Sequence, residues 1–243
     1  MELTGKTALV TGGGSGIGLG VALALSRQGC RVVISGRDGQ KLEQAANRGD
    51  GQPPILSRVC DVSSRGDVQN LVDWAIERLG PLDIVVNSAG INVARRKMCE
   101  LDPADFDRIM AINCTGFYNV LHAVLPGMRQ RRAGLIVSIS SVAGKRALPL
   151  AGPAYCASKF AATALGTAVG LEERPNGIRI TNIYPGEVDT PILDQRPVPV
   201  PAERKARMIH PEDIGACVVA LARLPAHVVV PELIITPTYQ EYL

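Results

Sequence analysis

Strand-like and helix-like segments alternate along this sequence from one end to the other. The strand-like runs are short and apolar, and helical stretches separate them; they occupy residues 6–11, 31–35, 55–60, 83–87, 134–140, 178–184 and 231–236. Strands joined by helices pair in parallel, and the helices then cover both faces of the sheet. We therefore predict a seven-stranded parallel sheet of the doubly wound α/β class. No domain boundary is visible, so we expect a single domain over residues 1–243.

A glycine-rich turn follows the first of these runs. The strand at residues 6–11 leads directly into residues 11–18 (TGGGSGIG), and an apolar, alanine-bearing stretch follows at residues 19–28. A turn in this position opens a helix whose first amide groups can hold a pyrophosphate, which glycine allows to approach closely. A glycine cluster alone could be only a flexible turn. The order strand, turn, helix predicts dinucleotide binding.

Tyr155 and Lys159 form a candidate acid/base pair. They are four residues apart in a helix-like run, which places phenol and ammonium on one helical face, and Ser141 lies 14 positions upstream of Tyr155. A phenol loses its proton near pH 10, so proton transfer near pH 7 needs a pKa shift of roughly 3 units, or about 4 kcal/mol. An ammonium about 4 Å away supplies about 4 kcal/mol at an effective dielectric near 20. The pair is thus expected to be a proton donor tuned for neutral pH, although the spacing alone also fits a half-buried ring beside a solvated amine.

The glycine turn, Ser141, Tyr155 and Lys159 together resemble the short-chain dehydrogenase/reductase family over nearly the whole chain. Further motifs match in order: Asp61 after the third strand, residues 87–90 (NSAG) after the fourth, Asn113 within a helix, and residues 184–190 (YPGEVDT) after the sixth. The resemblance implies a Rossmann-type sheet in the order 3-2-1-4-5-6-7, with the cofactor across the carboxyl ends of the strands. One position departs from the family, which usually has a second asparagine where Ser88 stands. We expect altered bracing of the central sheet there, with the chemistry intact.

The resemblance also assigns catalytic roles to Asn113, Ser141, Tyr155 and Lys159. Tyr155 would protonate the substrate oxygen as hydride arrives from the nicotinamide, and Ser141 would donate to the same oxygen. Lys159 would lower the pKa of the phenol and bind the nicotinamide ribose. Asn113, which on its own would indicate a local backbone bond or a kink in the helix, would hold a water that links Lys159 to solvent.

Cofactor preference is read at the end of the second strand. The position that carries an acidic residue in NAD-dependent members is Gly36, and the next residue is Arg37, which suits a 2′-phosphate. Ser15 could donate to the same phosphate. These residues favour NADP, and the alternative is that Asp38 binds the ribose of NAD. The residues expected to bind the cofactor are Gly12, Gly14, Ser15, Ile17, Gly18, Arg37, Asp61, Val62, Asn87, Ala89, Gly90, Tyr155, Lys159, Pro185, Gly186, Val188 and Thr190.

The substrate pocket is expected between the loops at 91–100 and 143–152 and a flap at about residues 190–210. The flap is distinctive because prolines alternate at positions 197, 199 and 201 before a charged helical stretch. These segments also carry basic side chains, which could attract an anionic substrate or could serve solubility alone. They are Arg95, Arg96, Lys97, Lys145, Arg146 and Arg196.

Two enzymatic interpretations remain open. The favoured one is an NADP(H)-dependent oxidoreductase that interconverts a carbonyl and an alcohol on a small 3-hydroxy acid or on an aldehyde or ketone. Residues 224–240 resemble family members that oxidise 3-hydroxy acids such as serine with NADP. The alternative is a reductase of 3-oxoacyl thioesters on acyl-carrier protein, although the glycine-pair ending common in those enzymes is missing. A non-catalytic NADP-binding regulatory protein is disfavoured, because all four catalytic positions are filled.

Composition sets the remaining expectations. A net charge of +3 gives no reason to expect a nucleic-acid or membrane partner. The six cysteines show no Cys-x2-Cys pair and suggest reduced, buried thiols, and the three dispersed histidines suggest no metal site. No apolar run reaches about 18 residues and the N-terminus lacks secretion-signal features, so we expect a cytoplasmic protein. The helix at residues 155–172 is rich in alanine and glycine, which favours packing against a twin helix in a homodimer or homotetramer, although tight packing onto the chain's own sheet would explain the same composition.

Overall fold

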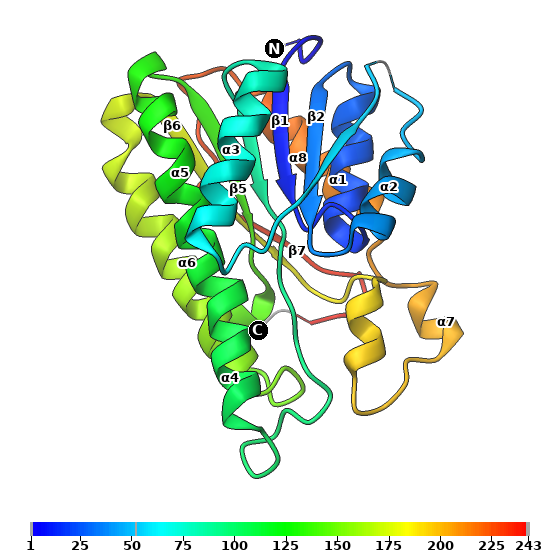
Figure 1. Cartoon of the computed structure of the whole chain (residues 1–243). Helices are drawn as coiled ribbons and strands as arrows, with labels where there is room; N and C mark the ends of the chain where they lie inside the picture. The colour runs from blue at the N-terminus through cyan, green and yellow to red at the C-terminus, as the bar shows by residue number, and fades with distance from the viewer. Residues whose placement is uncertain (1, 52, 242–243) are drawn as a thin grey trace.

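Seven parallel strands form one sheet in the order β3-β2-β1-β4-β5-β6-β7, which confirms the predicted topology. The computed structural model describes residues 2–51 and 53–241 (Figure 1). All the strands lie within one or two residues of the predicted runs. They are β1 (Thr7–Thr11), β2 (Arg31–Gly36), β3 (Leu56–Val59), β4 (Ile84–Asn87), β5 (Gly134–Ile139), β6 (Ile178–Pro185) and β7 (Glu232–Ile235).

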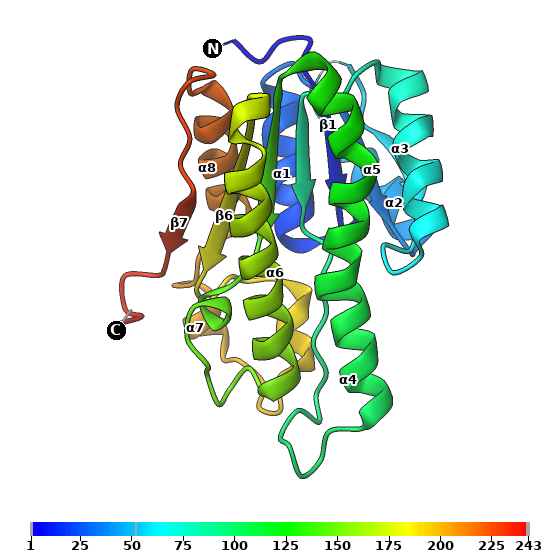
Figure 2. The same cartoon turned by 90° about the vertical axis from the view of Figure 1, so that its left-hand side faces the viewer.

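Helices cover both faces of this sheet (Figures 1 and 2). On one face lie α1 (Gly16–Arg27), α2 (Gly39–Ala46) and α8 (Pro211–Arg223), and on the other lie α3 (Arg65–Leu79), α5 (Gly116–Arg131) and α6 (Pro153–Glu172). Successive strand residues point to opposite faces, so the two cores alternate along each strand. In β1, Val10 packs in the core under α1 and α8, whereas Leu9 packs in the core under α3 and α5.

The longest apolar helical stretch runs from Pro103 to Arg131 and comprises α4 (Pro103–Met110), a π-helical segment (Ala111–Thr115) and α5. It is long and apolar enough to cross a membrane, but 56% of its most apolar window is buried inside the fold. Phe117 and Leu121 of α5 lie in the core of the sheet. The stretch is therefore explained as a core helix, whose α4 end extends past the carboxyl ends of the strands (Figure 2).

All six cysteines are free thiols, as expected. The expectation that they are buried is confirmed for Cys30, Cys60 and Cys156 but is wrong for Cys99, which is exposed. Cys99 lies in the loop between β4 and α4.

Candidate active site

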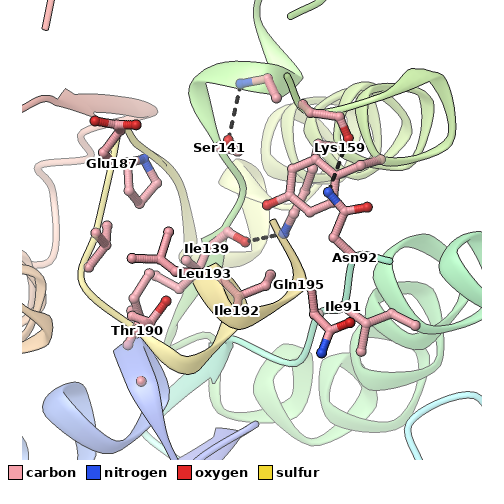
Figure 3. Close-up of a pocket in the computed structure, with 18 of the residues that line it drawn as sticks. Ile91, Asn92, Ile139, Ser141, Lys159, Glu187, Thr190, Ile192, Leu193 and Gln195 are labelled. Carbon is pink, nitrogen blue, oxygen red and sulfur yellow. Dashed lines mark hydrogen bonds between the residues drawn. The ribbon is translucent and has the colours of Figure 1, made fainter. Parts of the chain in front are cut away.

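A cavity of about 600 Å³ lies at the carboxyl ends of the central strands (Figure 3). Its walls come from the glycine turn after β1, the segments after β4, β5 and β6, helix α6 and the flap. A second cavity of about 200 Å³ lies beside the ends of β2 and β3. Gly12, Ser15, Arg37, Gly90 and Ile91 line both cavities, which together form one elongated cleft.

The glycine turn sits against the segment that follows β4. Gly12 has a φ of +66°, and a Cβ there would lie 2.8 Å from the Ala89 nitrogen. A Cβ on Gly18 would lie 2.2 Å from the Gly12 oxygen. Helix α1 then begins at Gly16, and the side chain of its N-cap residue Ser15 makes no capping bond. The first amide groups of α1 thus lack an intrahelical or side-chain acceptor, which fits a cradle for a diphosphate.

The end of β2 places both Arg37 and Asp38 along the second cavity, and only Arg37 also reaches the larger one. Arg37 lines both cavities. The Asp38 carboxylate caps α2 by accepting from the Lys41 amide at 3.1 Å, and it lies 3.7 Å from the Lys41 ammonium. The Asp38 carboxylate therefore caps its own helix, whereas Arg37 lines the part of the cleft that both cavities share.

Asp61 and Val62 line the second cavity as the sequence predicts for residues beside the adenine. The Asp61 carboxylate accepts from the Ser63 amide at 2.9 Å and the Ser63 hydroxyl at 2.7 Å. Burial opposes its charge, but the bonds from Ser63 and the charge of Arg37 outweigh burial and hold the pKa of Asp61 below its usual value. Asp61 therefore stays ionised at neutral pH, and its bonds to Ser63 hold the segment after β3 that lines the second cavity.

A hydrogen bond between the side chains of Thr11 and Asn87 joins the ends of β1 and β4. The Thr11 hydroxyl donates to Asn87 Oδ1 at 3.2 Å and accepts from the Ala89 amide at 3.4 Å. Both side chains are buried. Ser88, at the position that departs from the family pattern, lines the larger cavity instead.

Tyr155 and Lys159 lie on one face of α6, as their spacing predicts. The Lys159 ammonium is 5.7 Å from the centre of the Tyr155 ring and donates to the Ile139 oxygen at 2.9 Å. Ser141 caps the short 3-10 turn Val142–Gly144 and accepts from the Ala143 amide at 3.1 Å. In Figure 3, Ser141 and Lys159 lie on one side of the cavity and Thr190 and Leu193 lie on the opposite side.

Asn113 occupies the π-helical segment between α4 and α5, so the predicted local irregularity is present. Its Oδ1 accepts from the Ile91 amide at 2.8 Å, and its Nδ2 donates to the Ile91 oxygen and the Ser158 hydroxyl, each at 3.0 Å. A Cβ on Gly90 would lie 3.4 Å from Asn113 Oδ1 and 3.5 Å from the Lys159 ammonium. Asn113 and Lys159 therefore flank Gly90 at the base of the cleft.

The predicted tuning of Tyr155 by Lys159 is wrong for the free chain. Burial raises the pKa of Tyr155 to about 12, and the strongest opposing influences are a hydrogen bond with Ser141 and the charge of Arg96. Burial also lowers the pKa of Lys159 to about 8. The sequence argument assumed a contact of about 4 Å and left out the cost of desolvation, whereas both groups are desolvated and the ammonium is bonded to a carbonyl.

Of the basic loop residues, Arg96 and Arg196 line the larger cavity. Arg196 pairs with Glu187 at 2.9 Å, and Lys145 pairs with Glu232 at 2.6 Å. Arg95 is exposed. The remaining predicted cofactor positions after β6 line the larger cavity; they are Pro185, Gly186, Val188 and Thr190.

Glu187 was not singled out from the sequence. Its side chain is 10% exposed and binds Arg196, Arg204 and the Tyr239 hydroxyl, while its amide donates to the Gln240 side chain. The signal that the sequence offers is weak, because Glu187 is one of two acidic residues inside the run 184–190. Among residues 2–51 and 53–241, no group of three or more histidine, cysteine or acidic side chains is arranged to hold a metal ion.

Comparisons with known proteins agree on one family. The profile of the short chain dehydrogenase family matches residues 6–198. The chain is 36% identical to glycine betaine reductase of Emericella nidulans over 241 residues, which cover 97% of this chain but only 19% of that protein. It is 33% identical to an uncharacterized oxidoreductase of Staphylococcus saprophyticus, a match that covers 98% of this chain and 99% of that protein.

Solved structures match along the whole length. An alcohol dehydrogenase of Thermococcus sibiricus in complex with 5-hydroxy-NADP has a TM-score of 0.86 at 29% identity, covering 98% of this chain and 99% of that one. A variant of the actinorhodin polyketide ketoreductase with NADPH has a TM-score of 0.87 at 29% identity, covering 100% and 99%. The closed form of a serine dehydrogenase with NADP+ has a TM-score of 0.86 at 26% identity, covering 97% and 96%.

Proposed function

This chain belongs to the short-chain dehydrogenase family, and on that premise we propose that it is an NADP(H)-dependent oxidoreductase acting on a small 3-hydroxy acid or the corresponding aldehyde or ketone. The observation that carries the proposal is the convergence of Ser141, Tyr155 and Lys159 on one cavity that continues into the glycine cradle. Arg37 at the end of β2 supports NADP over NAD, and the similar structures described above carry NADP, NADPH or a derivative.

The residues present fit this cofactor, which when bound supplies or accepts the hydride. The amides at the start of α1 would hold the diphosphate, Arg37 and Ser15 the 2′-phosphate, and Asp61 and Val62 the adenine. Position 36 itself is a glycine and adds no carboxylate to repel a phosphate; the carboxylates that line this cavity belong to Asp38, which caps α2, and Asp61, which is bonded to Ser63. The two cavities together extend from the residues after β3 to those of α6, so the adenine would lie beside β3 and the nicotinamide beside α6.

Proton transfer falls to Tyr155. With a pKa of about 12 it keeps its proton at neutral pH and can give it to a carbonyl oxygen that gains charge. The Ser141 oxygen accepts from the Ala143 amide, and in the free chain its hydroxyl is hydrogen-bonded with Tyr155. When substrate enters, the same hydroxyl would turn to donate to the substrate oxygen. Lys159 donates one of its three hydrogens to Ile139, so two remain for the ribose or for Tyr155. Asn113 holds the segment at Ile91 beside Lys159. A water bound to the second lone pair of Asn113 Oδ1 would complete the path by which protons pass between Lys159 and solvent.

The fold does not choose between the two substrate interpretations, since the serine dehydrogenase and the polyketide ketoreductase match almost equally well. The tail favours the small acid. Tyr239 and Gln240 bind Glu187, which also binds Arg196 of the flap, so residues of the tail help to fix one wall of the cavity. A wall fixed in this way suits a small substrate better than a long thioester chain.

A substrate panel tests the proposal. We expect the purified protein to reduce NADP+ in the presence of serine or 3-hydroxyisobutyrate, as measured by the absorbance of NADPH. Reduction of NAD+ with the same substrates should be slower. Turnover of acetoacetyl thioester with NADPH, without turnover of either hydroxy acid, would establish the thioester alternative instead.

Further properties of the chain are part of this proposal. Residues 190–210 would act as a flap of the single domain, and the protein would associate with itself. Six free thiols suit the cytoplasm, where thiols are kept reduced.

A further inference from the structure

Arg96 is a buried arginine in the loop after β4, with 7% of its surface exposed, and it lines the larger cavity. Its Nε donates to the Val93 oxygen at 2.8 Å and its Nη1 to the Leu150 oxygen at 3.2 Å, and its Nη2 donates to the Gln195 oxygen. These carbonyls belong to the three segments that were expected to form the substrate pocket. The guanidinium therefore stands where all three segments meet.

The charge of Arg96 has no anionic partner among the described residues. Its acceptors are neutral carbonyls, and the described ion pairs do not include it. Arg129 and Arg196, by contrast, each have a carboxylate partner, Glu173 and Glu187. Two other partly or fully buried cations, Arg179 and Lys159, bond to backbone carbonyls as Arg96 does. Burial, reinforced by the like charge of Arg196, lowers the pKa of Arg96 from its usual value. An unpaired buried charge is costly, and an anion that enters the cavity would relieve that cost.

The backbone fixes this guanidinium relative to Tyr155. Gly152 has a φ of +80°, and a Cβ there would lie 2.6 Å from the Arg96 oxygen and 2.9 Å from the Arg96 Cβ. Only glycine allows the loop before α6 to pack this closely on the arginine. Because α6 begins at Pro153 and carries Tyr155, the cation and the phenol are anchored to the same helix start. The two groups also interact electrostatically, as the effect of Arg96 on Tyr155 shows.

We propose that Arg96 binds the carboxylate of the substrate while Tyr155 faces the carbonyl or hydroxyl of the same molecule. The inference rests on the proposed function and narrows its substrate class to molecules with an acidic group near the reacting carbon. A guanidinium has five N–H donors, and the three carbonyls take three of them. Two remain, which is the number that one carboxylate accepts in a bidentate pair.

The kinetic test compares an acid with its neutral ester. In the wild-type enzyme we expect kcat/KM to be higher for 3-hydroxyisobutyrate than for its methyl ester. Arg96→Gln should lower kcat/KM for the acid by about 100-fold, the scale of a lost hydrogen-bonded charge pair, and change it for the ester by less than about 3-fold. Arg96→Lys should restore part of the acid activity. Arg95→Gln, which changes the exposed neighbouring arginine, should leave both substrates unaffected.

A binding measurement separates failure of this inference from failure of the proposed function. Isobutyrate has the carboxylate but no reacting hydroxyl, and isobutyramide is its neutral counterpart. Saturation-transfer NMR with the NADP+ complex should detect binding of isobutyrate to the wild-type and Arg95→Gln proteins. It should detect no binding of isobutyramide to the wild type and no binding of isobutyrate to Arg96→Gln. Equal binding of acid and amide by the wild type, or no binding of isobutyrate, would overturn the inference even if Arg96→Gln failed to fold. Arg96-dependent isobutyrate binding without turnover of any hydroxy acid would uphold the anion site and reject the proposed reaction. Equal losses for acid and ester in a folded Arg96→Gln enzyme would show that Arg96 only joins the three loops.

Discussion

Tyr155 stands in an environment that keeps its phenol protonated, because burial is the largest influence on its pKa. Such a group is an acid at neutral pH, and it becomes a base only when nearby positive charge offsets burial. In this structure Arg96 provides such charge and Ser141 provides a hydrogen bond. In the free chain Tyr155 therefore has the protonation state that carbonyl reduction requires. The rate of alcohol oxidation, which requires the deprotonated phenol, should increase as the pH rises.

Removing the Tyr155 hydroxyl tests whether the chain is an enzyme or only a dinucleotide-binding protein. Tyr155→Phe keeps the ring beside Lys159, so we expect NADPH affinity, measured by fluorescence titration, to change little. Turnover should fall by about 10²- to 10⁴-fold, the usual contribution of a general acid. Unchanged turnover in this variant would leave the reaction without its proton donor and would favour the regulatory interpretation.

Lys159 should leave a signature in the pH dependence of stability. Its ordinary pKa is 10.5 and its pKa in the folded chain is about 8, so between these values the unfolded chain holds a proton that the folded chain has lost. The free energy of unfolding contributed by Lys159 therefore rises with pH across this window, and its burial penalty is complete below pH 8, at about 3 kcal/mol.

Replacing this lysine by methionine removes that penalty. Relative to wild type, we expect the stability of Lys159→Met to fall by about 3 kcal/mol between pH 7 and pH 10.5, measured by urea unfolding. Tyr155 has a raised pKa, so its contribution is lost as the pH rises above 10, but this loss is common to both proteins. Lys97→Met, at an exposed lysine, is the control and should show no such trend. A difference that stays constant with pH would mean that Lys159 keeps its proton in the folded chain.

At the scale of elements, Glu187 ties the flap and the tail to the segment after β6. Its Oε1 accepts from Arg196 and Arg204, and its Oε2 accepts from Arg204 and Tyr239. Desolvation opposes the charge, but the bonds from Tyr239 and the two arginines keep the pKa of Glu187 below its usual value. An ionised carboxylate at this point can accept charged hydrogen bonds from two guanidinium groups at once, whereas a neutral amide offers only one acceptor oxygen.

Glu187→Gln should consequently loosen the flap. We expect trypsin to cut after Arg204 at least about 10-fold faster, because the free energy of local opening falls by the contribution of a charged hydrogen bond. Arg196 is not a trypsin site, since Pro197 follows it. The KM for the hydroxy acid should rise more than kcat falls, since the flap wall is displaced and Tyr155 is not. Asp105→Asn, which breaks an exposed ion pair with Arg108 on α4, is the matched control. If cleavage of Glu187→Gln and of this control is equally fast, the flap is held by other contacts.

The elements also show which features a sequence can reveal. Strand positions followed from apolar runs between helices, because buried parallel strands leave a strong local pattern. The sequence indicated a local irregularity at Asn113 but not its π-helical form over Ala111–Thr115, where Asn113 bonds to Ile91, 22 residues earlier in the chain. The same is true of Arg96, whose isolation from carboxylates became visible only when the three loops were placed together.

For the whole molecule, the order of the strands was predicted from the family resemblance, and the central strands are buried on both faces as this order requires. Protonation states could not be inferred in the same way. They depend on how deeply each group lies in the assembled fold, so a spacing that correctly placed Tyr155 and Lys159 on one helical face gave the wrong direction for the pKa of the phenol.

The outer face of α6 indicates how whole molecules would associate. Five of its exposed positions form an apolar stripe with a spacing of three and four residues, beside the exposed polar residues Thr167 and Glu172; they are Ala157, Phe160, Ala164, Ala168 and Leu171. Phe160 is 43% exposed and Leu171 is 56% exposed, and Tyr118 on α5 is 41% exposed. Figure 2 shows α5 and α6 side by side along this face. A continuous apolar stripe between small residues suits a second copy of the same helix across a twofold axis.

We therefore expect the wild-type protein to be a dimer or a tetramer by light scattering after size exclusion. Phe160→Asp and Leu171→Asp should each shift the mass toward the monomer, because a twofold axis brings each new charge near its own copy and desolvates both. Met98→Asp, at a loop side chain that is 79% exposed and outside the stripe, should leave the mass unchanged. Since α6 also carries Tyr155 and Lys159, dissociation should lower activity together with mass in the two helix variants. A monomeric wild type, or helix variants with wild-type mass, would show that the stripe is not an interface.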